Sequence, residues 1–585
     1  MSLDDKLARL LKLNHQDAVE RDRLIIALDF GTTFSGIAYA FSTDPERVYS
    51  ITAWPGADDR KVPKAPTVIK YEGSTTTFKW GYELDQTLEE KIEGIKLLLD
   101  PDQPRPLYTS TNTHAEIAKL SKPVLEVATD YIRAIYQHAL REIENAYLAD
   151  YIKDYDKQYV LSVPAVWSDK AKDMTQRAAK NAGISPIELI KEPEAAALYT
   201  LNFMKNKGLK VGDAIVICDA GGGTVDLISY EITCLDPLTL EELVPGSGGL
   251  AGSLMLNKRF EHWIQETVGD AEYIELKKTD GYRAAMQQFD LSIKPAFRSK
   301  QDPDRYISFP MAKLKDDDSK GIVKNSIILK GTTLFNIFDP IFHDINKYLT
   351  EQVNKVQIKR LIAHHPNGGA VRAIFLVGGF GSSVYLRDAI AASHPDIQVI
   401  QPNDAWSAIV KGAVLSKLPR EAMVVSNAAE KHYGTCCHSL YDSLRDKGEE
   451  RIWDDWEENE KCAIMQWFIY KKDEKLVRNK KIPLPFYRKF AGENPSKDDL
   501  KIKSELYESA ALLAPGHPKN VRVSHILNTD LSKVPKSYFI KKARKSDGAT
   551  YCELHFKLLI EIRSGPMKFS LEVGDEEYSA VNVDY

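Results

Sequence analysis

Two short segments of the chain combine an aspartate, glycines and threonine hydroxyls with a preceding apolar run. The first run covers residues 24–30 (LIIALDF) and the second covers residues 214–218 (AIVIC). Glycines let backbone N–H groups approach a ligand closely and threonine hydroxyls add donors, so each loop can wrap a phosphate. The polar residues that end or follow the two runs are Asp29, Gly31, Thr32, Thr33, Asp219, Gly221, Gly222, Gly223, Thr224 and Asp226.

Asp29 and Asp219 each close an apolar run, at the position where the Mg²⁺ of a bound phosphate would lie. Because Mg²⁺ keeps most of its waters, we expect both carboxylates to hold it through water. One Asp-x-Gly turn is usually an ordinary hairpin. This chain has two at strand ends, and a third glycine turn, residues 378–381, opens a later helix. The repetition favours two loops that hold the β- and γ-phosphates of a nucleotide from opposite sides.

The segments around these loops alternate between strand and helix patterns. Apolar residues three and four apart predict a helix over about 123–146, and residues 159–163 predict a strand that Pro164 ends. Ser168 can cap a helix that Gly183 stops. The alternation predicts an α/β domain over residues 21–418. A short amphipathic helix is expected over residues 1–20, where packing against the body is the simplest role.

The residue pattern changes after Pro419, from alternating strands and helices to charged runs and strand-like segments, which predicts a separate β-rich C-terminal domain over residues 419–585. In its last part, alternating apolar and polar residues predict three strands, at about 551–563, 568–573 and 578–585, and no long helical segment follows them. His432, Cys436, Cys437 and His438 are zinc-ligand types, but their spacing disfavours a metal site. Residues 465–490 interleave aromatic and basic side chains, which a solvated hairpin explains better than nucleic-acid binding.

Composition excludes several classes of protein. The 585 residues carry 78 Lys plus Arg against 83 Asp plus Glu, a formal charge of −5, so a nucleic-acid partner is not expected. The mean hydropathy of −0.33 and the lack of a long apolar run exclude a membrane span. Six cysteines without a regular framework fit a reducing compartment, and the first residues lack a secretory signal. We therefore expect a cytoplasmic protein, with the nucleus as the alternative.

The loop motifs resemble those of a known superfamily. DFGTT at 29–33, DAGGGTVD at 219–226 and LVGGFGSS at 376–383 are similar to the two phosphate motifs and the adenosine motif of actin-like ATPases. Residues 163–184 and 191–198 also resemble connecting segments of the heat shock protein 70 (DnaK-type) chaperone family. The likeness covers residues 24–416 and is greatest for the divergent branch that includes heat shock protein twelve and fungal relatives. It implies two duplicated ribonuclease-H-like lobes.

The resemblance also implies roles for single residues. Glu192 matches a glutamate that orients or deprotonates the attacking water, with an ion pair to Lys191 as the alternative. Asp219 matches the aspartate that positions Mg²⁺ and water, and Asp226 the residue that closes the same hairpin. Lys96 matches a lysine that neutralises charge on the γ-phosphate, although a solvated lysine is the alternative. Thr32, Thr33 and Thr224 match hydroxyls on the transferred phosphate, or else stabilise turns.

The adenosine side departs from the family pattern. Residues 380–382 lack the arginine that would stack on adenine, and Pro295 interrupts the helix that normally contributes charged residues. Lys294 is the remaining candidate there, beside the glycine-turn residues Gly378, Gly379 and Phe380. These departures place base affinity in question, whereas the phosphate motifs are intact.

The sequence therefore predicts an ATP-binding protein with slow Mg²⁺-dependent hydrolysis, using ATP/ADP and Mg²⁺, whose nucleotide state controls the C-terminal domain. Protein clients or partners would bind through that domain. The family's leucine-and-aspartate linker is missing from residues 416–434, so the usual coupling to client peptides lacks support. Two alternatives stay open: a nucleotide-gated scaffold with little hydrolysis, and, more remotely, a small-molecule kinase on the same fold.

Overall fold

The computed structural model describes most of the chain. It covers residues 22–73, 76–85, 90–100, 117–118, 122–147, 149–153, 155–204, 208–418, 423–470, 474–478, 480–563, 565–574, 576–578 and 581–584. The helix expected over residues 1–20 lies outside the described residues. No helix among those described has the length and apolar character needed to cross a membrane.

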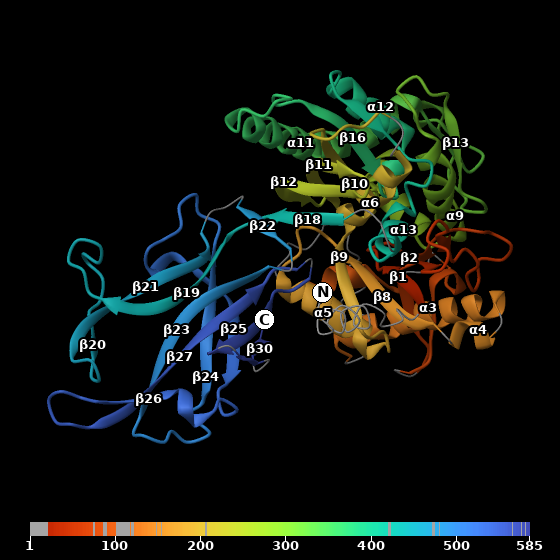
Figure 1. Ribbon diagram of the computed structural model, residues 1–585. Helices are drawn as coiled ribbons and strands as arrows, with labels where there is room; N and C mark the ends of the chain where they lie inside the picture. Colours follow the sequence, from red (N-terminus) through yellow and green to blue (C-terminus); the bar gives the residue numbers. More distant parts are fainter. Residues whose placement is uncertain are drawn as a thin grey trace, which may run out of the picture.

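The first lobe is built on a mixed sheet with the strand order β3-β2-β1-β8-β9 (Figure 1). Its centre is β1 (Arg23–Asp29), which pairs antiparallel with β2 (Phe34–Phe41) and parallel with β8 (Asp156–Val163). The apolar run of β1 is buried because both faces of this sheet are covered. The remaining strands are β3 (Tyr49–Ser50), β4 (Ala65–Pro66), which pairs with β2, and β9 (Ile187–Lys191).

The second lobe repeats this topology. Strand β10 (Ala214–Ala220) pairs antiparallel with β11 (Val225–Leu235) and parallel with β16 (Val371–Val377), and the strand order is β17-β16-β10-β11-β12. The outer strands are β12 (Leu238–Gly249) and β17 (Gln398–Ile400). Each lobe thus has an antiparallel meander of three strands followed by two parallel strands. The repetition confirms the predicted duplication and the actin-like ATPase fold.

Alternate residues of the central strands face two different cores. Leu24, Ile26 and Leu28 of β1 pack under α3 (Val124–Ala146) and α5 (Asp169–Asn181). Ile25 and Ala27 face the space between the lobes, which α6 (Glu192–Met204) and α13 (Ala408–Leu415) fill. The long helix α11 (Gly331–Ile362) covers the far face of the second lobe. This alternation follows from the two-residue period of a strand.

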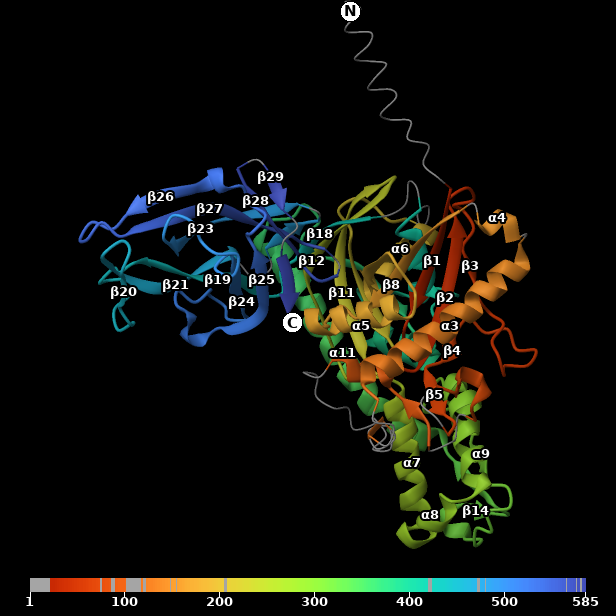
Figure 2. The ribbon, with the colours of Figure 1, turned by 90° about the horizontal axis from the view of Figure 1, so that it is seen from below.

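Smaller elements border the lobes. Figure 2 shows α7, α8, α9 and β14 projecting together at one end. Their bounds and those of the other small elements are β5 (Val68–Tyr71), β6 (Phe78–Trp80), η1 (Gly81–Glu83), β7 (Ile92–Glu93), η2 (Ile95–Leu99), α4 (Ala149–Lys153), α7 (Leu254–Val268), α8 (Asp270–Leu276), α9 (Asp280–Gln288), the π-helical turn η3 (Phe289–Ile293), α10 (Lys294–Ala296), β13 (Arg305–Ser308), η4 (Asp318–Lys320), β14 (Ile322–Val323), β15 (Ser326–Leu329), η5 (Phe380–Ser382) and α12 (Val384–Ser393).

Local predictions for the lobes agree with these bounds. The helix expected over about 123–146 is α3, and the strand expected over 159–163 is the buried part of β8. Ser168 caps α5, with its Oγ accepting from the Ala171 N–H at 3.2 Å. The cap satisfies a backbone donor that the helix itself leaves unpaired.

The C-terminal region consists of two antiparallel sheets, which Figure 2 shows extending to one side of the lobes. One hydrophobic core draws residues from both sheets, including Leu506 and Leu527 from the first and Leu554 and Ile560 from the second. The sheets therefore pack face to face, as in a β-sandwich. The first sheet contains β20 (Ile452–Asp454), β21 (Asn459–Ile469), β19 (His432–Leu440), β24 (Lys501–Ser509), β25 (Arg522–Asp530) and β30 (Val581–Asp584), and the second contains β23 (Lys481–Ala491), β27 (Thr550–Glu561), β28 (Lys568–Val573), β29 (Glu576–Tyr578) and β26 (Phe539–Ala543).

Two strands from beyond residue 418 complete the sheet of the second lobe. Strand β18 (Met423–Ala428) lies parallel to β12, and β22 (Lys475–Val477) pairs antiparallel with β18 (Figure 1). The stretch that lacks the family's linker motif therefore still joins the lobe. Strand pairing uses backbone groups, so the motif is not required, and Val424 adds a buried apolar side chain.

Candidate nucleotide site

A cavity of about 430 Å³ lies between the two lobes, at the ends of β1 and β10. It brings together most of the residues that the sequence singles out. Those that line it are Asp29, Gly31, Thr32, Thr33, Lys96, Glu192, Asp219, Gly221, Gly222, Gly223, Thr224, Lys294, Gly378 and Gly379. Two strand-end loops from different lobes therefore face one pocket, which is the arrangement predicted for gripping phosphates.

The two phosphate loops lie in contact. A Cβ atom at Gly222 would lie 2.3 Å from the Thr33 Oγ1, so only a glycine lets the loops approach this closely. The second loop closes on itself through the Gly221 N–H, which donates to the Thr224 carbonyl at 2.8 Å. The hairpins hold the backbone N–H groups and hydroxyls at the cavity wall.

Asp29 is already engaged by protein donors. Its Oδ2 lies 2.5 Å from the Lys64 Nζ, and its Oδ1 accepts from the Ser162 Oγ at 2.8 Å. Burial by itself would raise the pKa of Asp29, but the Lys64 and Lys96 charges and these hydrogen bonds outweigh it and hold the pKa below its usual value. Lys64 lines the cavity as well, although no motif in the sequence marked it.

Glu192 forms a buried ion pair with Lys96. Burial, followed by the nearby charges of Asp29 and Asp226, raises the pKa of Glu192 to about 7 although Lys96 opposes the shift. The alternative partner Lys191 instead lies 3.4 Å from Glu242 and 3.8 Å from Glu430. Lys96, on the short helix η2, is 3% exposed, so the alternative of a solvated lysine is wrong.

Asp219 is the carboxylate with the strongest case for a metal ion. Its pKa is raised well above the usual value, mainly by burial and then by the negative charges of Glu192, Asp226 and Asp29. If fully ionised, the carboxylates Asp29, Glu192, Asp219 and Asp226 would exceed the ammonium groups Lys64 and Lys96 by two charges. A divalent cation beside Asp219 would balance that excess, so this part of the site fits Mg²⁺.

Two predicted residues do not line the cavity. Asp226 lies beneath the second loop, where burial raises its pKa, and its Oδ1 has no hydrogen-bond partner among the described residues. Phe380 turns into the core of the second lobe, with its ring 6.3 Å from that of Phe338. An apolar ring is more stable in that core than at a polar rim, so Phe380 is not placed to contact a base.

The opposite end of the cavity combines a polar cluster and an aromatic edge. Lys294 pairs with Asp290 and donates to the Asn257 Oδ1 at 3.1 Å. Asp290 lies in the π-helical turn η3, which breaks the regular helix here. Trp406 and Phe34, whose rings meet edge to face at 5.3 Å, offer an apolar surface. Asp290, Leu291, Pro295 and Ser382 also line the cavity and belong to the divergent adenosine-side segments of the sequence. Sequence patterns did not mark the other lining residues, Phe34, Lys64, Ser253, Leu254, Asn257, Trp406 and Ile409.

The cysteines do not form a second site of the kind considered above. His432 is buried and its Nε2 lies 3.1 Å from the Ala511 carbonyl oxygen. In the described part of the chain, the side chains of Asp446, Cys462 and His517 place potential metal-ligand atoms within 4.8 Å of one another. Both oxygens of Asp446 accept from Arg445 at 2.7 Å, which makes it an ion pair rather than an open ligand.

Comparison with known proteins agrees with this fold. The duplicated lobes and the pocket between them define an actin-like ATPase domain, and a family model described as Hsp70 protein matches residues 107–233. Heat shock 70 kDa protein 12A of Mus musculus is 25% identical over 493 residues, covering 69% of this chain and 71% of the relative. Heat shock 70 kDa protein 12B of Homo sapiens is 25% identical over 479 residues, covering 67% and 68%.

More distant similarity extends to bacterial chaperones. Chaperone protein HscA of Proteus mirabilis is 24% identical over 267 residues, which is 43% of this chain and 39% of the relative. These matches confirm the predicted resemblance, and the chain fits a divergent branch of the Hsp70 family. The homology supports nucleotide binding and a chaperone-related role.

Proposed function

We propose that the protein binds ATP with Mg²⁺ between its lobes and hydrolyses the γ-phosphate slowly. The observation that carries this proposal is the meeting of two glycine hairpins, the carboxylates Asp29, Glu192 and Asp219, and two buried lysines at one cavity boundary. Hairpins from both lobes can contact the same phosphates, so nucleotide binding would favour the closed arrangement of the lobes.

Separate residues would serve separate parts of the reaction. Asp219 would hold Mg²⁺, which when bound offsets phosphate charge. Glu192 would orient a water and accept its proton, which its raised pKa favours at neutral pH. Lys96, paired with Glu192, would offset charge that develops on the transferred phosphate. Thr33 and Thr224 would donate hydroxyl hydrogen bonds to phosphate oxygens.

We further propose that the nucleotide state reaches the C-terminal sheets through the start of α6. Arg478, directly after β22, binds Glu194 with both guanidinium nitrogens at 2.7 and 2.5 Å. Glu194 lies two residues after Glu192. Lys191, the residue directly before Glu192, lies near Glu242 and Glu430. A shift of Glu192 on nucleotide binding would therefore move groups that hold β18 and β22.

The junction also has room for such movement. A cavity of about 870 Å³ separates the lobes from the C-terminal sheets, with Glu194 and Arg478 on one side and residues of β28 and β30 on the other. His525 of β25 reaches Asp169 of α5 at 3.4 Å across the same junction. Protein clients or partners would then meet a C-terminal region whose position depends on the nucleotide.

The six free cysteines support a reducing compartment, the cytosol or the nucleus.

Single-turnover phosphate release from ATP tests the enzyme. Asp219→Asn keeps the side-chain shape but removes the charge that faces the metal, so we expect release to fall at least about 100-fold. Asp388→Asn, an exposed position on α12, is the matched control and should release phosphate at the original rate. Equal rates for the protein and Asp219→Asn would contradict the proposal.

One observation favours the alternative of a nucleotide-gated scaffold. The Glu192 Oε1 is bound to the buried Lys96 ammonium, which weakens this oxygen as an acceptor for a proton of water in this arrangement. A protein that binds ATP, releases no phosphate and still changes its protease-cleavage pattern near β22 would be such a scaffold. A partner would then respond to occupancy of the pocket rather than to hydrolysis.

A further inference from the structure

Lys64 enters the phosphate pocket from a loop that the phosphate motifs do not include. It directly precedes β4, which pairs with β2 through Ser35 and Ala65, and its carbonyl accepts from the Tyr82 hydroxyl at 3.2 Å. Its side chain crosses β2 at Gly36, where a Cβ atom would lie 2.9 Å from the Lys64 Cγ. The lysine is therefore fixed at its backbone and guided along its stem.

The end of this side chain occupies the cation position beside Asp29. Its Nζ lies 2.5 Å from Oδ2, the side chains are 6% and 2% exposed, and Ser162 donates to the other oxygen. A carboxylate that already holds a buried ammonium is a poor place for a hydrated Mg²⁺, since the ammonium neutralises the carboxylate and repels a second cation. The predicted metal role of Asp29 therefore does not fit this arrangement.

Lys64 also faces the space where the phosphates would lie. It lines the cavity together with both glycine hairpins, and its charge acts on Asp219 across the pocket as well as on Asp29. An ammonium has three donors, so it can bind Asp29 and still donate to a phosphate oxygen. Burial strengthens such a charge-assisted hydrogen bond because little water competes for it.

We propose that Lys64 is a built-in cation of the phosphate site, which contacts the phosphates of a nucleoside di- or triphosphate from the Asp29 side. Divalent metal is then held on the Asp219 side alone. This inference rests on the proposed nucleotide binding. Its consequence is that part of the affinity for nucleotide survives removal of Mg²⁺.

Calorimetric binding of ADP, with Mg²⁺ and with excess EDTA, tests this directly. In EDTA we expect Lys64→Met to bind ADP about 10- to 100-fold more weakly than the unaltered protein, the range for one charge-assisted hydrogen bond. With Mg²⁺ the loss should be smaller, since a metal ion can then approach Asp29. Lys79→Met, an exposed lysine on β6, is the matched control and should behave as the unaltered protein.

The outcomes separate this inference from the proposed function. If the unaltered protein binds no ADP even with Mg²⁺, both are overturned. If it binds ADP and Lys64→Met binds equally well in EDTA, nucleotide binding stands and the role of Lys64 is overturned.

Loss of Lys64 alone leaves a buried carboxylate unpaired, which can unfold the lobe. The double variant Asp29→Asn/Lys64→Met removes both charges and keeps the test valid. We expect it to melt near the temperature of the unaltered protein and to show the same weakened ADP binding in EDTA. A folded double variant with unchanged ADP affinity in EDTA would overturn the proposal.

Discussion

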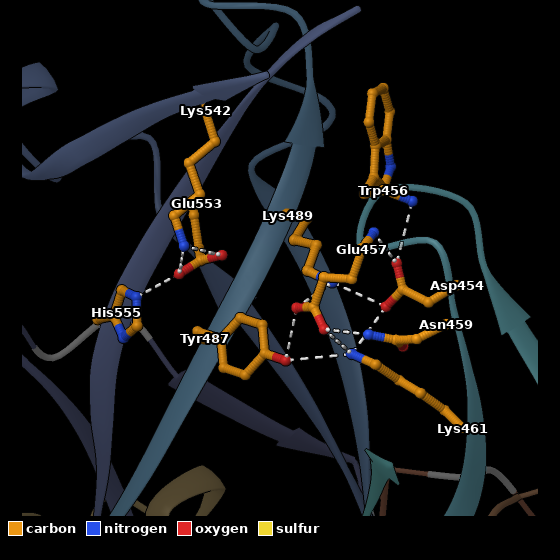
Figure 3. A network of polar contacts seen from close by, with 10 residues as sticks. All are labelled: Asp454, Trp456, Glu457, Asn459, Lys461, Tyr487, Lys489, Lys542, Glu553 and His555. Atoms are coloured by element: carbon orange, nitrogen blue, oxygen red, sulfur yellow. Dashed lines mark hydrogen bonds and ion pairs between the residues drawn. The ribbon is translucent and has the colours of Figure 1, made fainter. Parts of the chain in front are cut away.

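Two clusters of acids and lysines in the described part of the chain, one buried and one half-buried, differ in charge balance. The pocket cluster consists of the carboxylates Asp29, Glu192, Asp219 and Asp226 with the lysines Lys64 and Lys96. The C-terminal cluster consists of Asp454, Glu457, Lys461 and Lys489, where each lysine bridges both carboxylates at 2.6 to 2.8 Å (Figure 3).

Three of the four pocket carboxyl groups shift their pKa in the opposite direction to those of the C-terminal cluster. In the C-terminal cluster, burial would raise the pKa of Glu457, but hydrogen bonds from Lys461 and Lys489 outweigh it and lower the pKa to about 2. In the pocket cluster, burial and neighbouring carboxylates raise the pKa values of Glu192 and Asp219, and burial raises that of Asp226. Asp29 is the exception, because the Lys64 and Lys96 charges hold its pKa below the usual value. A balanced cluster is complete in the protein itself, whereas an unbalanced one gains from a cation supplied from outside.

The C-terminal cluster therefore has a structural role. It joins β21 and the turn after β20 in one sheet to β23 in the other, and the Tyr487 hydroxyl adds a hydrogen bond to the Glu457 Oε1 at 3.1 Å (Figure 3). A neighbouring group on β26 and β27, in which Lys542 and His555 flank Glu553, is likewise paired. Four predictions test whether charge balance separates the functional cluster from the structural one.

Glu192→Gln should have the largest effect. It keeps the shape but cannot accept a proton, so single-turnover phosphate release should fall about 100- to 1,000-fold while ATP binding is retained. Glu188→Gln, an exposed residue of β9, is the control. A rate unchanged by Glu192→Gln would show that the pocket cluster does not supply the base.

Lys461→Met should come next, because it leaves two part-buried carboxylates with one lysine. We expect the free energy of local unfolding around this cluster to fall by about 2–3 kcal/mol at neutral pH. The measurement is amide hydrogen exchange, which should become faster in β21 and β23. Because the folded pKa of Glu457 lies below its unfolded value, the contribution is present at neutral pH and is lost as the pH falls toward about 2.

ADP binding by Lys461→Met serves as the control for this prediction. Lys461 lies in the C-terminal sheets, so ADP affinity should stay unchanged. Unaltered hydrogen exchange in Lys461→Met would mean that the cluster does not hold the two sheets together.

The pH profile of hydrolysis should show a third, smaller effect. Glu192 with a pKa of about 7 must lose its proton to act as a base, so kcat/KM should rise about tenfold per pH unit below 7 and level off above it. Glu192→Gln should remove this limb of the profile. A flat profile between pH 5.5 and 8.5 for the unaltered protein would contradict a raised pKa at the base.

Lys541→Met should have the smallest effect. Lys541 pairs with Glu493 at 2.6 Å, but their side chains are 65% and 44% exposed, so water screens the pair. We expect the free energy of unfolding of the C-terminal region to change by less than about 0.5 kcal/mol in urea titrations. A loss of stability as large as that of Lys461→Met would show that burial does not determine how much these ion pairs contribute to stability.

Local sequence patterns predicted the parts of the site that lie on single loops. An apolar run followed by glycines predicts a buried strand and a tight hairpin, so Asp29, Asp219 and both phosphate loops were found. The repeat of that pattern also predicted that two loops face one another across a nucleotide, whereas the two duplicated lobes were implied by the family resemblance. Ser168 and the spacing of apolar residues likewise predicted α5 and α3, because capping and amphipathicity depend on neighbours a few residues apart.

Only the tertiary structure decided which charged groups meet. Lys64 reaches Asp29 from 35 positions away, Lys96 reaches Glu192 from 96, and Arg478 reaches Glu194 from 284. No local pattern encodes such pairs, because they depend on how strands and loops from separate segments are packed. Burial then sets their chemistry, since removal of water makes each paired or unpaired charge count far more than it would on the surface.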